Sequence, residues 1–263
     1  FPILRVRPEA MDRLLADSGY DVAGLRAEVA ARRQGGEGPG WFTVPLGVRA
    51  RARVELGAAE ERLGYNVLGI LPGSDTSMDR EALLVSTHYD LPEPNPGQPY
   101  LSAGDGPAGI GVVLEMLRLW EEQGFRPRRT ILFGAWCGGY LTRSGAATYA
   151  EAHTTYSSLE RVGVLHLGQV GSGGEVLRIG VGRDALGTLV EGGCGRVGVR
   201  CEGGLPALHA YEREFAQSAT RLAWAGAPGP YDAVDGQLPL QSERLAEVGN
   251  LVTYALVTAS RQF

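Results

Sequence analysis

The stretch Ala82-Leu-Leu-Val-Ser-Thr87 is an apolar run of the length expected for a buried strand. An amphipathic pattern over residues 107–123 follows it and predicts a helix. A second apolar run, Thr130-Ile-Leu-Phe-Gly-Ala-Trp136, predicts another buried strand. Strand, helix and strand in this order form the unit from which parallel sheets are built, so the stretch 82–136 predicts an α/β fold.

The same alternation continues on both sides of this stretch. We expect further strands at residues 48–56, 66–70, 162–167, 176–181 and 221–225, and helices at residues 141–152 and 242–260. The strand at 48–56 is predicted from a period of two, with Arg49, Arg51 and Arg53 on one face. Together these elements predict a three-layer α/β/α sandwich around a mixed, mostly parallel sheet.

The N-terminal part of the chain has a different character. Residues 9–17 and 22–33 predict two short helices, with Asp21 as the cap of the second. The Gly-rich stretch 35–40 then predicts a flexible linker. We therefore divide the chain into a helical segment with its linker, residues 1–40, and an α/β domain, residues 41–263.

Composition limits the possible partners. The chain has 263 residues, of which 44% are hydrophobic and 21% charged, as in globular domains, and its net charge of −5 does not favour nucleic acid as a partner. No apolar run is long enough for a transmembrane helix. Of the three cysteines, Cys194 and Cys201 are close enough in sequence to pair, which leaves Cys137 over.

Polar residues follow the apolar strands at places where a site is expected. His88-Tyr-Asp90 comes directly after the strand at 82–87, and Asp105 precedes the helix at 107–123. Asp232 lies in a loop before the final helix. Ligand-binding groups in such sheets come from loops at the carboxyl ends of strands, so these residues are the candidates for a site.

The order of these motifs resembles the family of zinc aminopeptidases with two catalytic metal ions. Relatives of that family include glutaminyl cyclase, glutamate carboxypeptidase, the transferrin receptor ectodomain and nicastrin. The resemblance starts at Asn66-Val-Leu-Gly-Ile-Leu-Pro-Gly-Ser74 and continues through Val85-Ser-Thr-His-Tyr-Asp90, Gly104-Asp-Gly-Pro-Ala-Gly109 and Thr130–Trp136. The resemblance covers about residues 49–263. Residues 1–33 resemble the tail of the protease-associated domain that proteins of this family often carry.

Part of the family's metal site is present in this sequence. The resemblance implies that His88 occupies the position of a zinc ligand and Asp105 that of the aspartate bridging the two metal ions. Asp90 matches the carboxylate that orients the histidine. These three residues are what the family pattern requires.

Other positions of the pattern have changed. The two adjacent glutamates of the family, one a general base and one a metal ligand, align with Gly139 and Tyr140. A further aspartate ligand aligns with Gly168, and the final histidine ligand aligns with Asp232. The remaining candidate ligands are His88, Asp105 and Asp232. Because Asp105 is shared, one metal position keeps His88 and Asp105 and the other keeps Asp105 and Asp232. Zinc sites use three or four protein ligands, so the sequence predicts that zinc is not bound tightly.

The sequence therefore predicts an aminopeptidase-like domain without peptidase activity, which serves as a binding or scaffold module for a protein or peptide. An active metal-dependent hydrolase with a rebuilt or single-metal site is the alternative. A third possibility is a pocket in which Asp105 and Asp232 bind a peptide N-terminus without cutting it. The family resemblance also implies an exported or cell-surface protein of a bacterium.

Two further residues lie near the predicted site. His166 precedes Gly168 by two residues, so it points to the same side of its strand but lies about 6–7 Å back, which favours a core histidine or one that supports the site. Cys137 follows the strand at 130–136, and a thiol–histidine pair with His88 is an alternative for it.

Overall fold

The structure is a computed structural model of the chain. It describes residues 8–35, 51, 53, 55, 58, 61, 63–90, 104, 106–139, 144–151, 156, 158–180, 184–205, 219–227 and 240–262. The chain divides into two units, Phe1–Glu61 and Arg62–Phe263. The domain boundary predicted at residue 40 lies outside the described residues and stays a prediction.

The first unit contains the two predicted helices, α1 (Pro8–Leu15) and α2 (Val22–Gly35). Gly19, with φ of 77°, lies in the turn between them, where a left-handed conformation favours glycine. Asp21 caps α2 as predicted, because its Oδ1 accepts a hydrogen bond of 2.6 Å from the amide of Gly24. The amide of Val22 donates to Asp12 in α1 over 2.9 Å, which fixes the start of α2 against α1.

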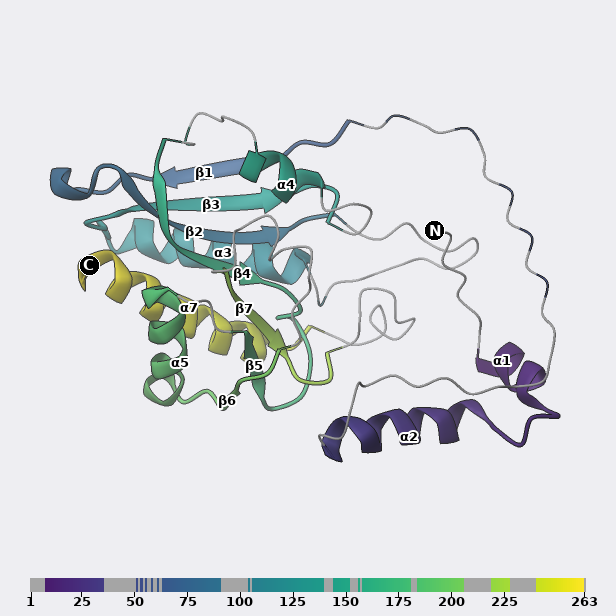
Figure 1. Cartoon of the computed structure of the whole chain (residues 1–263). Helices are drawn as coiled ribbons and strands as arrows, with labels where there is room; N and C mark the ends of the chain where they lie inside the picture. The colour runs from purple at the N-terminus through teal and green to yellow at the C-terminus, as the bar shows by residue number, and fades with distance from the viewer. Residues whose placement is uncertain are drawn as a thin grey trace. The chain divides into compact units, whose positions relative to one another are not determined.

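The second unit is built on a sheet of seven strands among the described residues, in the order β1-β3-β2-β4-β7-β5-β6 (Figure 1). Their bounds are β1 Val67–Leu71, β2 Glu81–His88, β3 Thr130–Trp136, β4 Glu160–Leu167, β5 Leu177–Gly180, β6 Cys201–Glu202 and β7 Ala219–Trp224. The pairs β2–β3, β2–β4, β4–β7 and β5–β6 are parallel, whereas β1–β3 and β5–β7 are antiparallel. The sheet is mixed and mostly parallel, as the sequence predicts.

Helices cover both faces of this sheet. Alternate residues of β2 enter different cores, because side chains point to opposite faces along a strand. Leu83 and Val85 join the larger core under α3 (Gly106–Glu122), α5 (Ala185–Val197) and α7 (Ser242–Gln262). Ala82 and Leu84 join the smaller core under α4 (Ser144–Glu151). A short 3₁₀ helix, η1 (Thr76–Met78), precedes β2. The predicted three-layer α/β/α sandwich is confirmed (Figure 1).

One predicted element is not found where it can be checked. Arg51, Arg53 and Glu55 are described residues of the strand predicted at 48–56, and none of them is in a strand. The side chains of Arg53 and Glu55 are 84% and 74% exposed and form an ion pair. A period of two indicates a strand only when one face is buried, and these side chains of the segment are not buried.

A disulfide bond joins the end of α5 to β6. Cys194 and Cys201 pair with their Cα atoms 6.0 Å apart, as their spacing allows. Between them, Gly198 ends α5 with φ of 76°, and its amide donates to the carbonyl of Cys194. Cys137 is the free cysteine.

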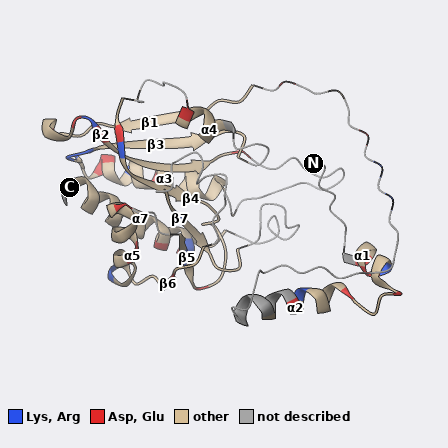
Figure 2. Ribbon diagram, in the orientation of Figure 1, with Lys and Arg blue, Asp and Glu red and all other residues tan. Residues whose placement is uncertain are grey.

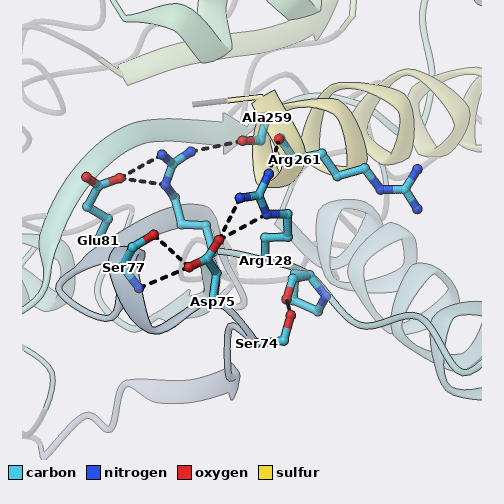
Figure 3. A network of polar contacts seen from close by, with 9 residues as sticks. Ser74, Asp75, Ser77, Glu81, Arg128, Ala259 and Arg261 are labelled. Atoms are coloured by element: carbon cyan, nitrogen blue, oxygen red, sulfur yellow. Dashed lines mark hydrogen bonds and ion pairs between the residues drawn. The ribbon is translucent and has the colours of Figure 1, made fainter.

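A polar network connects the end of the sheet at which β2 and β3 begin to the C-terminal end of α7 (Figure 3). Arg129 is 2% exposed; it pairs with Glu81 over 2.7 Å and donates to the carbonyl of Ala259 over 2.9 Å. Beside it, Arg128 pairs with Asp75 over 2.6 Å and donates to the carbonyl of Arg261. The network therefore joins three elements that are far apart in the sequence.

Asp75 is the acidic centre of that network. It accepts hydrogen bonds from the hydroxyl and amide of Ser77 as well as from Arg128. The Ser77 hydroxyl, followed by the Arg128 guanidinium, lowers the pKa of Asp75 from 3.8 to about 2. Asp75 is thus held as a carboxylate over the whole neutral range.

Acidic and basic residues are interspersed along the described ribbon, with no block of a single sign (Figure 2). This distribution agrees with the prediction that nucleic acid is not the partner. Among the helices that the structure describes, none has both the length and the apolar character of a membrane span.

Candidate functional site

The candidate site lies where β2, β3 and β4 end. These strands are parallel, so the segments that follow them meet at one edge of the sheet. The chain leaves β2 through α3 to reach β3 on one side and later forms β4 on the other side. The end of β2 is therefore a point at which the strand order reverses, and ligands bind at such points in open α/β sheets.

His88 is the last residue of β2 and is paired in register with Trp136 of β3. The residue is 7% exposed. Its Nδ1 lies 3.6 Å from Oδ1 of Asp90, and the same oxygen accepts a hydrogen bond of 3.0 Å from the amide of Gly139. Asp90 thus connects the imidazole to the segment that follows β3. The structure brings together His88, Asp90 and Gly139.

Two glycines approach the imidazole closely. A Cβ atom on Gly106 would lie 2.5 Å from Nδ1 and 2.7 Å from Cε1 of His88. A Cβ atom on Gly139 would lie 2.9 Å from Cβ and 3.0 Å from Cγ of His88, and 3.0 Å from Oδ1 of Asp90. Glycine at these two positions leaves room for the imidazole, and a larger residue at either would require its neighbours to shift.

The described residues do not fit the two-metal site of the family. Position 139 carries no carboxylate and lacks the space for one in this arrangement, and Gly168 at the end of β4 also lacks a ligand side chain. In the part of the chain that the structure describes, no three His, Cys, Asp or Glu side chains are grouped so that they could hold a metal ion. The other predicted site residues, Tyr140, Asp105 and Asp232, lie outside the described residues.

His166 is buried within the sheet at 3% exposure. Its Nδ1 lies 3.1 Å from the hydroxyl of Ser86, its register partner on β2, and Arg221 is its partner on β7. The prediction of a core histidine is confirmed. Ser86, His166 and Arg221 form a polar row across three strands, and Ser86 precedes His88 by two residues on β2. This row could not be predicted from the sequence, because it depends on the register of the strands.

Cys137 lies on the side of the site that faces β1. Its side chain contacts Tyr89 and approaches Gly64. The hydrogen bond with the thiol, together with burial, raises the pKa of the Tyr89 phenol, although the phenol also donates to the carbonyl of Tyr65 over 2.6 Å. The contacts that the structure gives to this thiol are therefore with the tyrosine that follows His88.

Asn66 positions the segment after β3 and was not predicted as a site residue. Its Nδ2 donates to the carbonyl of Gly145 over 2.8 Å, and its Oδ1 accepts from the amide of Cys137 over 3.2 Å. The amide of Gly145 in turn donates to the carbonyl of Cys137. The segment containing Gly139 is thus closed into a loop at its base. A polar residue just before an apolar strand was the signal in the sequence.

The segments after β2 and β4 are joined by their backbones. The amide of Gly171 donates to the carbonyl of Gly104, and the carbonyl of Gly171 accepts from the amide of Gln241, which precedes α7. A Cβ atom on Gly171 would lie 2.7 Å from that of Ala108 in α3. Glycine at 171 therefore allows three segments of the site edge to approach one another.

The comparisons with known proteins agree with this fold. The sequence profile of peptidase family M28 matches residues 66–196. The structure is similar to the zinc aminopeptidase BSAP from Bacillus subtilis, with 21% identity, a TM-score of 0.57, and coverage of 74% of this chain and 49% of that one. LapB from Legionella pneumophila gives 17% identity, a TM-score of 0.60 and coverage of 75% and 60%.

A second kind of enzyme shares the fold. Bacteroides thetaiotaomicron glutaminyl cyclase bound to N-acetylhistamine gives 16% identity, a TM-score of 0.55 and coverage of 73% and 76%. This chain spans about half the length of the Bacillus subtilis enzyme and of an Aneurinibacillus aminopeptidase, of which it covers 49% and 47%. No curated protein matches the sequence. Residues 66–196, which carry His88, Asp90 and Gly139, belong to peptidase family M28.

Proposed function

We propose that the α/β unit is an aminopeptidase-like module that does not hydrolyse peptides and serves as a binding or scaffold module. The observation that carries this proposal is Gly139. The family resemblance puts a glutamate at this position, and here the backbone amide donates to Asp90 while His88 occupies the adjacent space. A glutamate at position 139 would require the segment after β3 or the end of β2 to shift, because its Cβ atom would lie 2.9 Å from that of His88.

The magnitude of the missing contribution supports the proposal. A general base that takes the proton from the attacking water contributes about 10²–10⁴ to the rate. Gly139 supplies no such group, and Gly168 supplies no metal ligand. The general base is missing after β3 and a metal ligand is missing after β4. A single compensating substitution elsewhere cannot replace both. We expect a protein or peptide as the partner of this module, and no zinc as a tightly held cofactor.

One observation favours the alternative of a single-metal hydrolase. His88 and Asp90 keep the arrangement of a metal-binding histidine, in which the second ring nitrogen faces a carboxylate, here over 3.6 Å. Such a carboxylate fixes the orientation of the ring and raises its basicity. This pair alone is short of the three protein ligands of a catalytic zinc site.

Metal content and turnover test the two proposals together. The chain, purified without a metal-affinity tag and dialysed against zinc at about micromolar concentration, is expected to hold less than a tenth of an equivalent by mass spectrometry, since zinc sites need three or four ligands. We also expect no release of product from aminoacyl p-nitroanilides of leucine, alanine or arginine above the uncatalysed rate.

The two results separate the hypotheses. About one tightly held equivalent of zinc together with turnover that a chelator abolishes would establish the single-metal hydrolase. Zinc without turnover would leave a metal-dependent binding module. The control is His88→Ala, which removes a candidate ligand and must abolish any zinc that wild-type protein retains.

The disulfide supports an exported protein. Disulfides persist in oxidising compartments outside the cytoplasm and are rare within it. In protein isolated from its native source under alkylating conditions, we expect Cys137 to be modified, and Cys194 and Cys201 to react only after reduction. Alkylation of all three cysteines without reduction, read by peptide mass spectrometry, would contradict export.

A further inference from the structure

The backbone at Gly106 and the backbone at Gly139 approach His88 from two sides. We propose that Gly106 and Gly139 form a glycine cradle around His88, which makes this histidine a structural residue of the β2 end and keeps a carboxylate out of position 139. The inference deepens the proposed function and rests on it, because it gives the physical reason why this site differs from that of a zinc peptidase.

The first side of the cradle is Gly106, the first residue of α3. A Cβ atom there would overlap the carbonyl oxygen of His88 and lie 2.5 Å from its Nδ1. Contacts below about 3.0 Å do not occur between real Cβ atoms and other heavy atoms, so something would have to shift. Here the obstacle is backbone of β2, which is held on both sides by β3 and β4.

The second side is Gly139, three residues beyond β3. A Cβ atom there would lie 2.9 Å from Cβ of His88, which is fixed to β2 and cannot rotate away. Asp90, the other neighbour, is held by its hydrogen bond with the Gly139 amide. The constraint at position 139 is lack of space, since the positive φ in this segment belongs to Gly138, at 70°.

The cradle links two features that are separate in the sequence. Glycine at 139 removes a catalytic carboxylate, and the same glycine lets the backbone close on His88. Restoring glutamate at 139 alone therefore does not rebuild the site, because its Cβ atom would lie 2.9 Å from that of His88 and the segment after β3 would have to shift to make room for it. The histidine remains because it fills this space, which explains its presence beside lost ligands.

A double-mutant cycle tests the cradle through stability alone. Gly139→Ala is expected to lower the Tm by roughly 3–10 °C, since overpacking a tight site costs a domain of this size about that much. In a His88→Gly background the same substitution is expected to change the Tm by less than about 2 °C, because the obstructing Cβ is gone. Gly111→Ala in α3 is the control for an added Cβ that meets nothing within 4 Å, and it is expected not to lower the Tm, because alanine favours a helix over glycine.

Zinc content gives an independent second test. Gly139→Glu, alone and combined with Tyr140→Glu, is expected to hold no more zinc than wild type and to melt at a lower temperature. One equivalent of zinc in the double variant at the wild-type Tm would overturn the cradle, as would a Gly139→Ala variant as stable as wild type. Peptidase activity of the wild-type protein would instead contradict the proposed function, so the two failures are distinguishable.

Discussion

Replacing Arg129 by alanine is expected to lower the free energy of unfolding by about 3–5 kcal/mol, because it removes a large buried side chain together with its hydrogen bonds to Glu81 and to the carbonyl of Ala259. The side chain is 3% exposed and links Glu81, at the start of β2, to the carbonyl of Ala259 in α7 (Figure 3). The substitution leaves that carbonyl without its guanidinium donor and opens a cavity between the sheet and the last turns of α7.

Denaturant unfolding followed by circular dichroism measures this change. Glu81→Gln is expected to cost about 1.5–3 kcal/mol, because the amide oxygen still accepts a hydrogen bond but the buried guanidinium of Arg129 loses its counter-charge. Arg200→Ala, at a side chain 70% exposed, serves as the surface control and is expected to change stability by less than about 0.5 kcal/mol. Equal effects of Arg129→Ala and Arg200→Ala would show that the network does not stabilise the fold.

Replacing Trp136 by alanine is expected to cost a further large amount, about 3–5 kcal/mol, because it empties the centre of the smaller core. The residue is 0% exposed, and its ring stacks on Tyr149 of α4 with centroids 4.8 Å apart. Trp136 also anchors the site edge, since it is in register with His88 and its carbonyl accepts a hydrogen bond from the amide of Tyr89. These backbone contacts remain in the alanine variant, so the loss of stability reports the ring in the smaller core.

Thermal and denaturant unfolding of Trp136→Ala and Trp136→Phe test this prediction. The phenylalanine variant keeps an aromatic ring against Tyr149 and is expected to lose clearly less stability than the alanine variant. Leu114→Ala removes an apolar side chain that is 61% exposed, and is expected to cost less than about 0.5 kcal/mol. If Trp136→Ala proves as mild as Leu114→Ala, α4 does not cover the sheet as described.

The central strands could be predicted from sequence because their apolar runs are continuous. The predicted bounds of β3 agree with the structure, and those of β2 differ by one residue at each end. The helix α5 was missed because Gly192, Gly193 and Gly195 obscure its pattern. Gly193 is there for packing, since its Cβ would lie 2.7 Å from the Tyr254 ring of α7. The local sequence does not distinguish a glycine that packs against a neighbouring helix from a glycine in a turn.

The candidate site could be predicted in composition but not in geometry. The family resemblance indicated His88, Asp90 and Gly139, and the structure places these three together. The closeness of Gly106 and Gly139 to the imidazole was not predicted, because it depends on how the loops after β2 and β3 close. The role of Asn66 was missed for the same reason, since its partners lie far away in the sequence.

The topology of the sheet also determines how the chain must assemble. None of the strand pairs in the described sheet is a hairpin. Even the shortest connection between two paired strands, from β5 to β6, contains the whole of α5. Every pairing therefore requires closure of a long loop before the contacts that compensate for its entropy can form. Chains with such non-local pairing fold in about milliseconds to seconds rather than microseconds. During that time the apolar strands β2 and β3 are exposed, so refolding is best carried out at low protein concentration.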